Sequence, residues 1–191
     1  MMIRTRARLA LVAASLLAAA ACESAVNSND TDEGTLSFSY AGDHSGSFSA
    51  TGAYDRLRPN ASPWAVGNRG TLQTGQTAIG VYARADRTGD NLVDEFLLLI
   101  EEPEVGSVTC TDVTADCPMG AFLILGTTPN GEEALAIYAS ASGTVNITAI
   151  NQDRATGNFV FTMEGFNVED AADSVQVTSG TFSVPVIRAV N

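Results

Sequence analysis

The chain has 191 residues, and its 22 acidic residues against ten arginines and no lysine give a formal net charge of −12. A surface with this balance repels nucleic acid and anionic lipid head groups, so nucleic acid is excluded as a partner. The length suffices for one domain with a substantial core and does not require a second domain.

The first 21 residues are typical of a bacterial export signal. Three arginines lie within the first eight residues, and the run at residues 9–21 contains only Ala, Leu, Val and one Ser. Ala19 and Ala21 are the small residues that a signal peptidase needs before a cut at Cys22. Because the apolar run is too short to span a bilayer, residues 1–21 are predicted to be a signal peptide.

This segment resembles the lipobox of bacterial lipoproteins over residues 1–23, through Leu16, Leu17, Ala19, Ala20, Ala21 and Cys22. The family usually has leucine where this chain has Ala19, so plain secretion after the same cut stays an alternative. The resemblance implies that Cys22 carries a diacylglycerol thioether and an amide-linked acyl chain, and several chains make a permanent membrane anchor. Glu23 differs from the aspartate that retains related lipoproteins at the inner membrane. The implied location is therefore the outer membrane, facing the periplasm or the cell surface.

Residues 22–34 are predicted to form a flexible, lipid-anchored tether, since they are small, polar and acidic and include no aromatic residue. Removal of residues 1–21 leaves seven arginines against 22 acidic residues, a net charge of −15. Residues 35–191 are predicted to form a single antiparallel β domain. The membrane, reached through Cys22, is its predicted partner, with an envelope protein or a glycan as further candidates.

Beyond the tether the apolar residues recur with period two, which is typical of strands with one buried face. Three places show this alternation: Leu36, Phe38 and Tyr40; Val145, Ile147 and Ala149; and Phe159, Phe161 and Met163. Polar turns between such runs predict β-hairpins. Pro185, in the last run, predicts an edge strand or a bulge, because it lacks a backbone N–H.

Four runs are more continuously apolar: residues 78–85, 96–100, 121–126 and 135–139. We expect these strands to be central and covered on both sides. Residues 132–142 allow a short Ala-rich helix as an alternative, but the alternation of Leu135 and Ile137 favours a strand. The sequence thus predicts an all-β fold, an antiparallel β-sandwich or flattened barrel of about 9–11 strands.

The strand phrases at residues 142–148, 157–162 and 179–184 are similar to ones in uncharacterised β-rich bacterial envelope lipoproteins. This resemblance covers only the carboxy-terminal part of the chain. It implies a β fold and an envelope location, and it brings no catalytic residue with it.

The segment at residues 55–76 is the predicted place for a binding function. It contains Arg56, Arg58 and Arg69 together with Trp64, the only tryptophan of the chain. Trp64 could stack on a sugar ring or anchor a peptide while the arginines grip an anion. The alternative is that Trp64 plugs the end of the fold and that the arginines pair with local acidic residues.

Cysteine arithmetic predicts one structural disulfide. If Cys22 is lipidated, Cys110 and Cys117 remain as a pair that flanks a short polar stretch, in a compartment where disulfides persist. A redox or metal site is the poorer interpretation, because no CxxC is present and His44, the only histidine, lies far away in the sequence.

A calcium loop is a weak candidate at Asp86, Asp90, Asn91 and Asp94, which supply oxygen ligands around a glycine. Their spacing departs from the EF-hand pattern and lacks its distal Glu, so a plain hairpin turn explains them better. We therefore predict no metal site, and nothing in the sequence implies a cofactor.

No catalytic residue is predicted. His44 has Asp and Ser as its neighbours, but adjacent turn residues point apart, so a polar turn tip explains it better than a catalytic triad. Paired carboxylates such as Asp94 and Glu95 are plentiful, yet neighbours on a strand do not face each other across a cleft. The predicted function is a lipid-anchored envelope module that binds a ligand or serves a structural role. The alternative is an acidic hydrolase, secreted or anchored, that uses such carboxylates.

Overall fold

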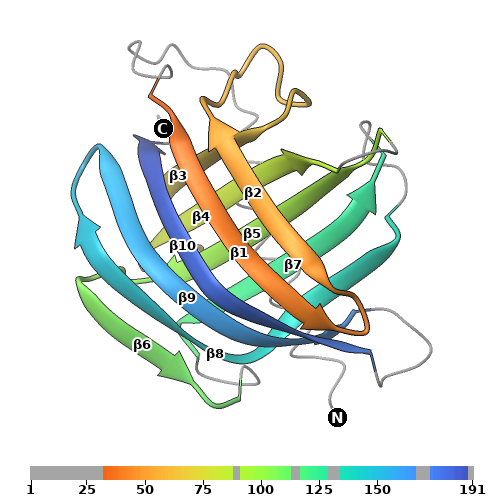
Figure 1. Ribbon diagram of the computed structural model, residues 1–191. Helices are drawn as coiled ribbons and strands as arrows, with labels where there is room; N and C mark the ends of the chain where they lie inside the picture. The colour runs from red at the N-terminus through yellow and green to blue at the C-terminus, as the bar shows by residue number, and fades with distance from the viewer. Residues whose placement is uncertain (1–31, 88–90, 113–116, 129–133, 167–172, 189–191) are drawn as a thin grey trace.

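The computed structural model describes residues 32–87, 91–112, 117–128, 134–166 and 173–188. Every regular element within these ranges is a strand, as Figure 1 shows. The ten strands are β1 (Gly34–Gly42), β2 (Gly46–Gly52), β3 (Trp64–Thr71), β4 (Thr77–Asp86), β5 (Val93–Glu101), β6 (Gly106–Cys110), β7 (Met119–Thr127), β8 (Ala136–Ile150), β9 (Arg154–Gly165) and β10 (Ser174–Arg188). The all-β prediction is confirmed. Residues 136–142, for which a helix was the alternative, belong to strand β8.

Seven strands close into a flattened barrel in the order β10-β3-β4-β5-β7-β8-β9, and the pairing of β9 with β10 completes the ring. The ring depends on a parallel pairing of β10 with β3 through Val186, Ile187 and Arg188, whereas its other pairings are antiparallel. The hairpin of β1 and β2 adds to β10, and β6 adds to β8.

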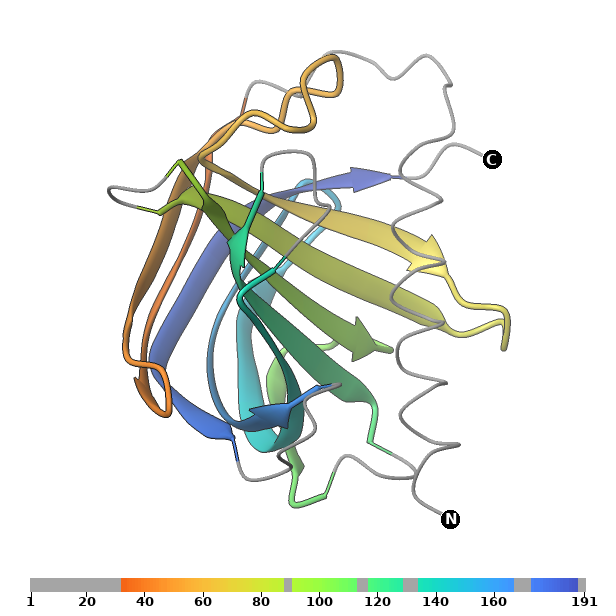
Figure 2. The same ribbon diagram turned by 90° about the vertical axis from the view of Figure 1, so that its right-hand side faces the viewer.

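The long strands β8 and β10 each change their pairing partner partway along one of their two sides. This change divides the ring into two layers. β10 pairs first with β1 and then, at its end, with β3, while β8 pairs first with β7 and then with β6. We call the layer β2-β1-β10-β9-β8-β6 the front sheet and the layer β3-β4-β5-β7 the back sheet. The strands of the two layers cross steeply in Figure 1 and lie on opposite sides of the molecule in Figure 2.

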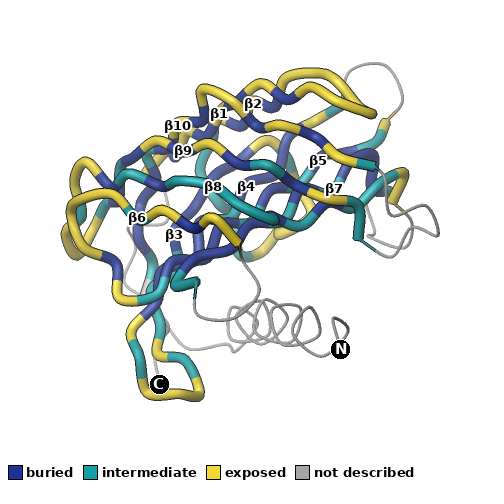
Figure 3. Tube along the Cα trace, turned by 90° about the horizontal axis from the view of Figure 1, so that it is seen from below, coloured by how far each residue is buried: buried dark blue, intermediate teal, exposed yellow. Residues whose placement is uncertain are grey.

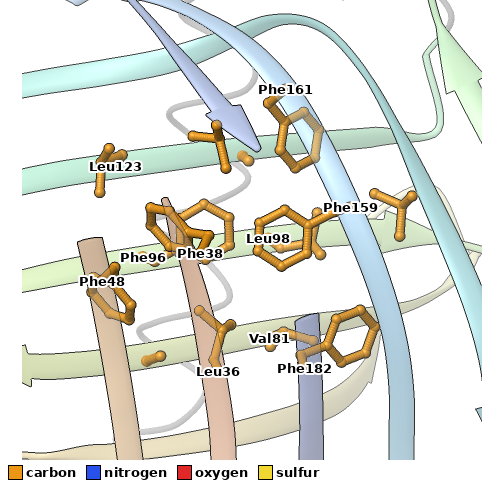
Figure 4. Packing of buried hydrophobic residues seen from close by; sticks show 14 of the residues in the cluster. Leu36, Phe38, Phe48, Val81, Phe96, Leu98, Leu123, Phe159, Phe161 and Phe182 are labelled. Atoms are coloured by element: carbon orange, nitrogen blue, oxygen red, sulfur yellow. The ribbon is translucent and has the colours of Figure 1, made fainter. Parts of the chain in front are cut away.

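The core lies between the two layers, and aromatic rings form its centre (Figure 4). The ring of Phe38 on β1 lies 4.9 Å from those of Phe48 on β2 and Phe96 on β5, measured between centroids. Phe96 in turn stacks on Phe159 of β9 at 5.1 Å. Full burial of one such side chain contributes roughly 1.5–3 kcal/mol, so these rings join front and back sheets strongly.

Glycines on the front sheet make room for these rings. Three of them lie directly opposite a phenylalanine: Gly143 opposite Phe161, Gly157 opposite Phe182, and Gly180 opposite Phe159. A Cβ atom at any of the three would come within 2.7 Å of the opposing ring. The glycines in the carboxy-terminal strand phrases therefore have a packing reason, because each lets a core ring lie over the neighbouring strand.

Pro185 lies in an interior strand, so the predicted edge strand is wrong, and the register shifts of β10 do not fall at Pro185, so the alternative of a bulge is not met either. β10 is an interior strand, and the edges of the front sheet are β2 and β6. The N–H of Val186 points toward β9, where it bonds to the carbonyl of Asp153, so the nitrogen of Pro185 points the other way. On that side β10 passes from its last β1 pair, at Ser183, to its first β3 pair, at Val186. The backbone N–H that Pro185 lacks would therefore point to the gap between β1 and β3, where no strand pairs with it.

Candidate functional site

Trp64 is the first residue of β3, and its side chain is covered. The ring is 2% exposed and lies edge-on to Tyr54 and Tyr82, at centroid distances of 4.7 and 4.9 Å. Its indole N–H donates to the carbonyl oxygen of Ala61 at 2.6 Å. The neighbour in the chain, Ala65, belongs to the core, so Trp64 lies on the outer side of the back sheet. In this arrangement no face of the ring is offered to a ligand.

The three arginines of the predicted binding segment differ in their surroundings. Arg58 is exposed and pairs with Asp55 at 2.8 Å, a hydrogen bond that lowers the pKa of this carboxyl below its usual value. Arg69 lies five residues further along β3, about 17 Å from Trp64 by the rise of a strand. Arg56 is half-buried. Since the indole ring is covered, its face is not open to an anion-binding site shared with these arginines.

A buried ionic group lies beside Trp64 and was missed by the sequence reasoning. Arg84, directly opposite Trp64 on β4, has a side chain only 4% exposed, and its Nε lies 3.5 Å from a carboxylate oxygen of Glu95. Tyr82 also bonds to Glu95, and burial, followed by the Glu95 charge, raises the pKa of Tyr82. The available signal was a lone arginine within the apolar run at residues 78–85. Because both partners occupy Glu95, this carboxylate is engaged within the fold.

Polar side chains also meet at the end of the barrel beneath the turn between β1 and β2. His44, in that turn, places Nδ1 at 2.5 Å from the hydroxyl of Tyr138 on β8. Asp43 accepts the backbone N–H of Ser174, which starts β10, at 2.5 Å. Burial first, and then nearby Asp173, raise the pKa of Tyr138. The contact of His44 is thus with a tyrosine, and Asp43 is bound elsewhere, so the turn closes the barrel end and forms no triad.

The residues of the calcium candidate do not converge. Asp94 shares the interior face of Ala85, its partner on β4, accepts the N–H of Gly126 at 2.7 Å and lies 3.6 Å from Arg87. Asp86, one position further on β4, points to the opposite face and accepts the hydroxyl of Ser62.

The remaining residues of the calcium candidate are Asp90 and Asn91. Asn91 has a φ of 56°, as in a turn, and Asp90 lies outside the described residues. Within the described ranges no group of three or more His, Cys, Asp or Glu side chains is placed to hold a metal ion.

Cys110 and Cys117 form a disulfide, as the sequence predicted. The bond connects the end of β6, an edge of the front sheet, with the segment that enters β7 of the back sheet. Because the bond links an edge strand of the front sheet to the back sheet, it fits a structural role. Cys22, the predicted lipidation site, lies outside the described residues.

The outer face of the front sheet carries rows of uncharged polar side chains. From the sequence, these residues were recognised only as the polar positions that alternate with the apolar ones along each strand. The first row crosses all six strands in direct register: Ser49, Ser37, Thr181, Asn158, Asn146 and Ser107. A second row holds Thr51, Thr35, Ser183 and Thr156. A third row has two parts, which meet where the pairing of β10 with β9 is irregular: Ser47, Ser39 and Thr178 on strands β2, β1 and β10, and Val160, Thr144 and Thr109 on strands β9, β8 and β6. We call these three the polar rows. They contain no Asp, Glu, Lys or Arg.

These rows face solvent. In Figure 3 buried positions alternate with more exposed ones along the strands of the front sheet. Of the polar-row residues, Thr144, Asn146, Thr156 and Ser183 are half-buried and the others are exposed. Toward one end of β9, Arg154 donates to the hydroxyl of Ser183 in the second row at 3.1 Å, and Glu164 lies toward the other end of this strand. The surface between them is therefore neutral, in a chain whose formal net charge is −12.

Comparison of the chain with protein-family models, with curated proteins and with solved structures finds no match. No helix long and apolar enough to cross a membrane occurs in the described part of the chain. The candidate site thus rests on the geometry of the front sheet.

Proposed function

We propose that the chain is a lipid-anchored protein of the bacterial outer envelope, and that it acts as a binding or structural module through the polar rows. The segment that ends at Cys22 supports the anchor, and residues 22–34 would tether the domain to the membrane. Secretion without lipid is the alternative fate. The observation that carries the binding role is the neutral first row, which runs unbroken across six strands of an otherwise acidic protein.

The second candidate, an acidic hydrolase, needs two carboxyl groups roughly 5–10 Å apart across a cleft. Asp94 and Glu95 are successive residues of β5, so their side chains point to opposite faces of the sheet. Asp94 is held by the N–H of Gly126, and Glu95 by Arg84. Since both carboxylates serve contacts within the fold, the geometry supports the module better than the enzyme.

The anchor is tested by intact mass of the protein extracted from membranes, with Cys22→Ala as the matched variant. We expect cleavage before Cys22 and an added mass of acyl chains, both of which the variant lacks. Cleavage without added mass would mean that the protein is secreted and that the anchor is wrong.

The binding role is tested with a Cys22→Ala variant whose residues 1–21 are replaced by an export signal that is cleaved without attachment of lipid, and this variant is mixed with isolated envelopes. We expect part of it to sediment with the envelopes, and a second change, Asn158→Arg at the centre of the first polar row, to abolish this retention. Equal retention with and without the Asn158 change would exclude the polar rows as the contact surface.

A further inference from the structure

The outer face of the back sheet is apolar. It carries the residues of β3, β5 and β7 that alternate with core residues such as Ala65, Leu98 and Leu123. Its large apolar side chains are Val66, Leu97, Leu99, Phe122 and Ile124. A contiguous apolar face of this kind marks a place where another segment or molecule binds.

The middle of this face is buried, although no strand lies over it among the described residues. Val66 is 5% exposed and Leu99 is 7% exposed. All ten strands belong to the two layers, and the front sheet lies against the inner side of the back sheet (Figure 2). Described loops contact the margins of the face, as where the ring of Phe166 lies edge-on to that of Phe122. The burial of Val66 and Leu99 thus points to a covering segment outside the described ranges.

Two glycines and one amide shape the centre of the face. Leu99 lies between Gly80 of β4 and Gly120 of β7, its partners in register. A Cβ atom at Gly80 would meet nothing within 4 Å, so the sheet backbone is open there to close approach by small side chains. Asn68, the partner of Gly80 on β3, has a buried Oδ1 that finds no hydrogen-bond partner among the described residues. A segment that covers this place should therefore be small and apolar and bring one donor.

Residues 9–21 have this composition. Every residue of the run is Ala, Leu or Val except Ser15, whose hydroxyl can donate from the middle of the run. As a helix these 13 residues would be about 20 Å long, whereas the axes of β3 and β7 lie about 14 Å apart across the sheet. The other segments outside the described ranges have at most six residues each.

The run is also within reach of the back sheet. The described chain enters β1 at Gly34, which is packed so closely against the carbonyl of Ala65 on β3 that no Cβ would fit. Residues 22–33 connect this point with the run, and these twelve residues span at most about 40 Å when extended. The connection is therefore long enough for residues 9–21 to cross the back sheet.

We propose that residues 9–21 lie across the outer face of the back sheet for as long as they stay attached to the domain. Their leucines meet the apolar side chains of this face, their alanines fit over Gly80, and Ser15 donates to Asn68. Cleavage before Cys22 releases the run and uncovers the face. The proposal goes beyond the envelope module, because it concerns the uncleaved chain and needs neither the lipid nor the polar rows.

The test is photo-cross-linking of the full chain. Cell-free synthesis without membranes, in an oxidising buffer, keeps residues 1–21 attached and lets the disulfide form, and Cys22→Ala prevents mispairing. The photoreactive residue p-benzoylphenylalanine replaces Leu97 on the back sheet. In the matched control it replaces Thr181, an exposed residue on the outer face of the front sheet. Mass spectrometry of digested monomers identifies the cross-linked residues, and thermal melting confirms that each variant is folded.

We expect the probe at Leu97 to join to residues 9–21 of the same molecule, and the probe at Thr181 to join to them far less. Leu16→Glu together with Leu17→Glu should lower the yield from Leu97 about tenfold, because charges in the run oppose its burial on an apolar face. The same double change should increase the binding of anilinonaphthalene sulfonate, a dye that reports exposed apolar surface.

The hydrogen bond is tested by Ser15→Ala, Asn68→Ala and both changes together in the full chain. We expect each single change to lower the melting temperature by roughly 2–4 °C. The double change should lower it no further than the larger single effect, because either change removes the same bond. If Ser15→Ala leaves the melting temperature unchanged while Asn68→Ala raises it, Ser15 is not the donor to Asn68.

A probe at Leu97 that joins two copies of the chain would make the back face a dimer contact, and the proposal would be wrong. It would also be wrong if this probe joined nothing within residues 9–21, or if Thr181 gave an equal yield, since the run would then adhere without preference. None of these results bears on the envelope module, which is tested on chains from which residues 1–21 have been removed.

Discussion

The outer faces of the two sheets have opposite chemistry although their inner faces are alike. The front sheet shows solvent the polar rows, whereas the back sheet carries buried or half-buried apolar side chains, among them Val66, Leu97, Leu99, Phe122 and Ile124. Both sheets supply the same kind of aliphatic and aromatic residues to the core. The inner faces therefore determine the fold. The two sheets differ in the side chains of their outer faces.

The largest effect is expected in the shared core. Phe96→Ala removes a fully buried ring that contacts Phe38 and Phe159 of the front sheet, and it should cost about 3–5 kcal/mol of the free energy of unfolding. Phe122→Ala, on the half-buried outer side of the back sheet, is the control and should cost clearly less. Denaturant unfolding measures both. Equal losses would mean that the back face is as much a core as the interior.

The disulfide comes next, because it links an edge of the front sheet to the back sheet. Replacing Cys110 and Cys117 together by alanine should lower the free energy of unfolding by about 2.5 kcal/mol, from the entropy that the closed loop removes from the unfolded chain. Urea unfolding with and without reductant measures this. The parent should respond to reductant and the double variant should not, and a parent indifferent to reductant would contradict the structural role.

Alkaline pH should act on the back face through Tyr82. Its pKa is raised in the folded state by burial and by Glu95, so its contribution to stability is complete below the usual value near 10 and is lost as pH rises further. The free energy of unfolding should fall by up to about 1.4 kcal/mol per pH unit for this tyrosine. Tyr82→Phe should make the fall shallower, as followed by thermal melting at rising pH. An unchanged slope would show that Tyr82 does not titrate differently on folding.

The smallest effect is expected on the front face. Thr181→Val removes an exposed hydroxyl of the first polar row but keeps a β-branched side chain, so the free energy of unfolding should change by less than about 0.5 kcal/mol. Urea unfolding beside the parent checks this. A loss well above 1 kcal/mol would mean that the rows serve stability, and the contrast between the two outer faces would then be structural and not functional.

The alternation of apolar residues was enough to predict the front strands and their buried sides. Leu36, Phe38 and Tyr40 are all buried, as period two requires. The closure of the barrel could not be predicted. β10 meets β3 through three residue pairs, and the two members of each pair are more than a hundred positions apart in the sequence. No local pattern encodes such a pairing.

The same local reasoning left two interpretations of Trp64, and the packing of its ring agrees with the one in which the indole fills part of the fold. Trp64 and its arginines looked like a binding loop because aromatic and basic residues were close in sequence, yet the indole is packed between two tyrosines. The first polar row joins residues from Ser37 to Thr181, and single serines and threonines on alternating strands give no signal of their own. Only the register of six strands turns them into one surface.

The start of the first strand has a mechanical consequence for the proposed tether. Arg154 holds the chain there, with bonds from its guanidinium to the carbonyl of Glu33 and to Ser183. The next residue, Gly34, starts β1, which is flanked on both sides by β2 and β10. If the front face is attached to a partner and the tether to a membrane, tension runs along β1 and loads its perpendicular hydrogen bonds in shear, all together. Under such a load β1 would resist pulling and would not peel away.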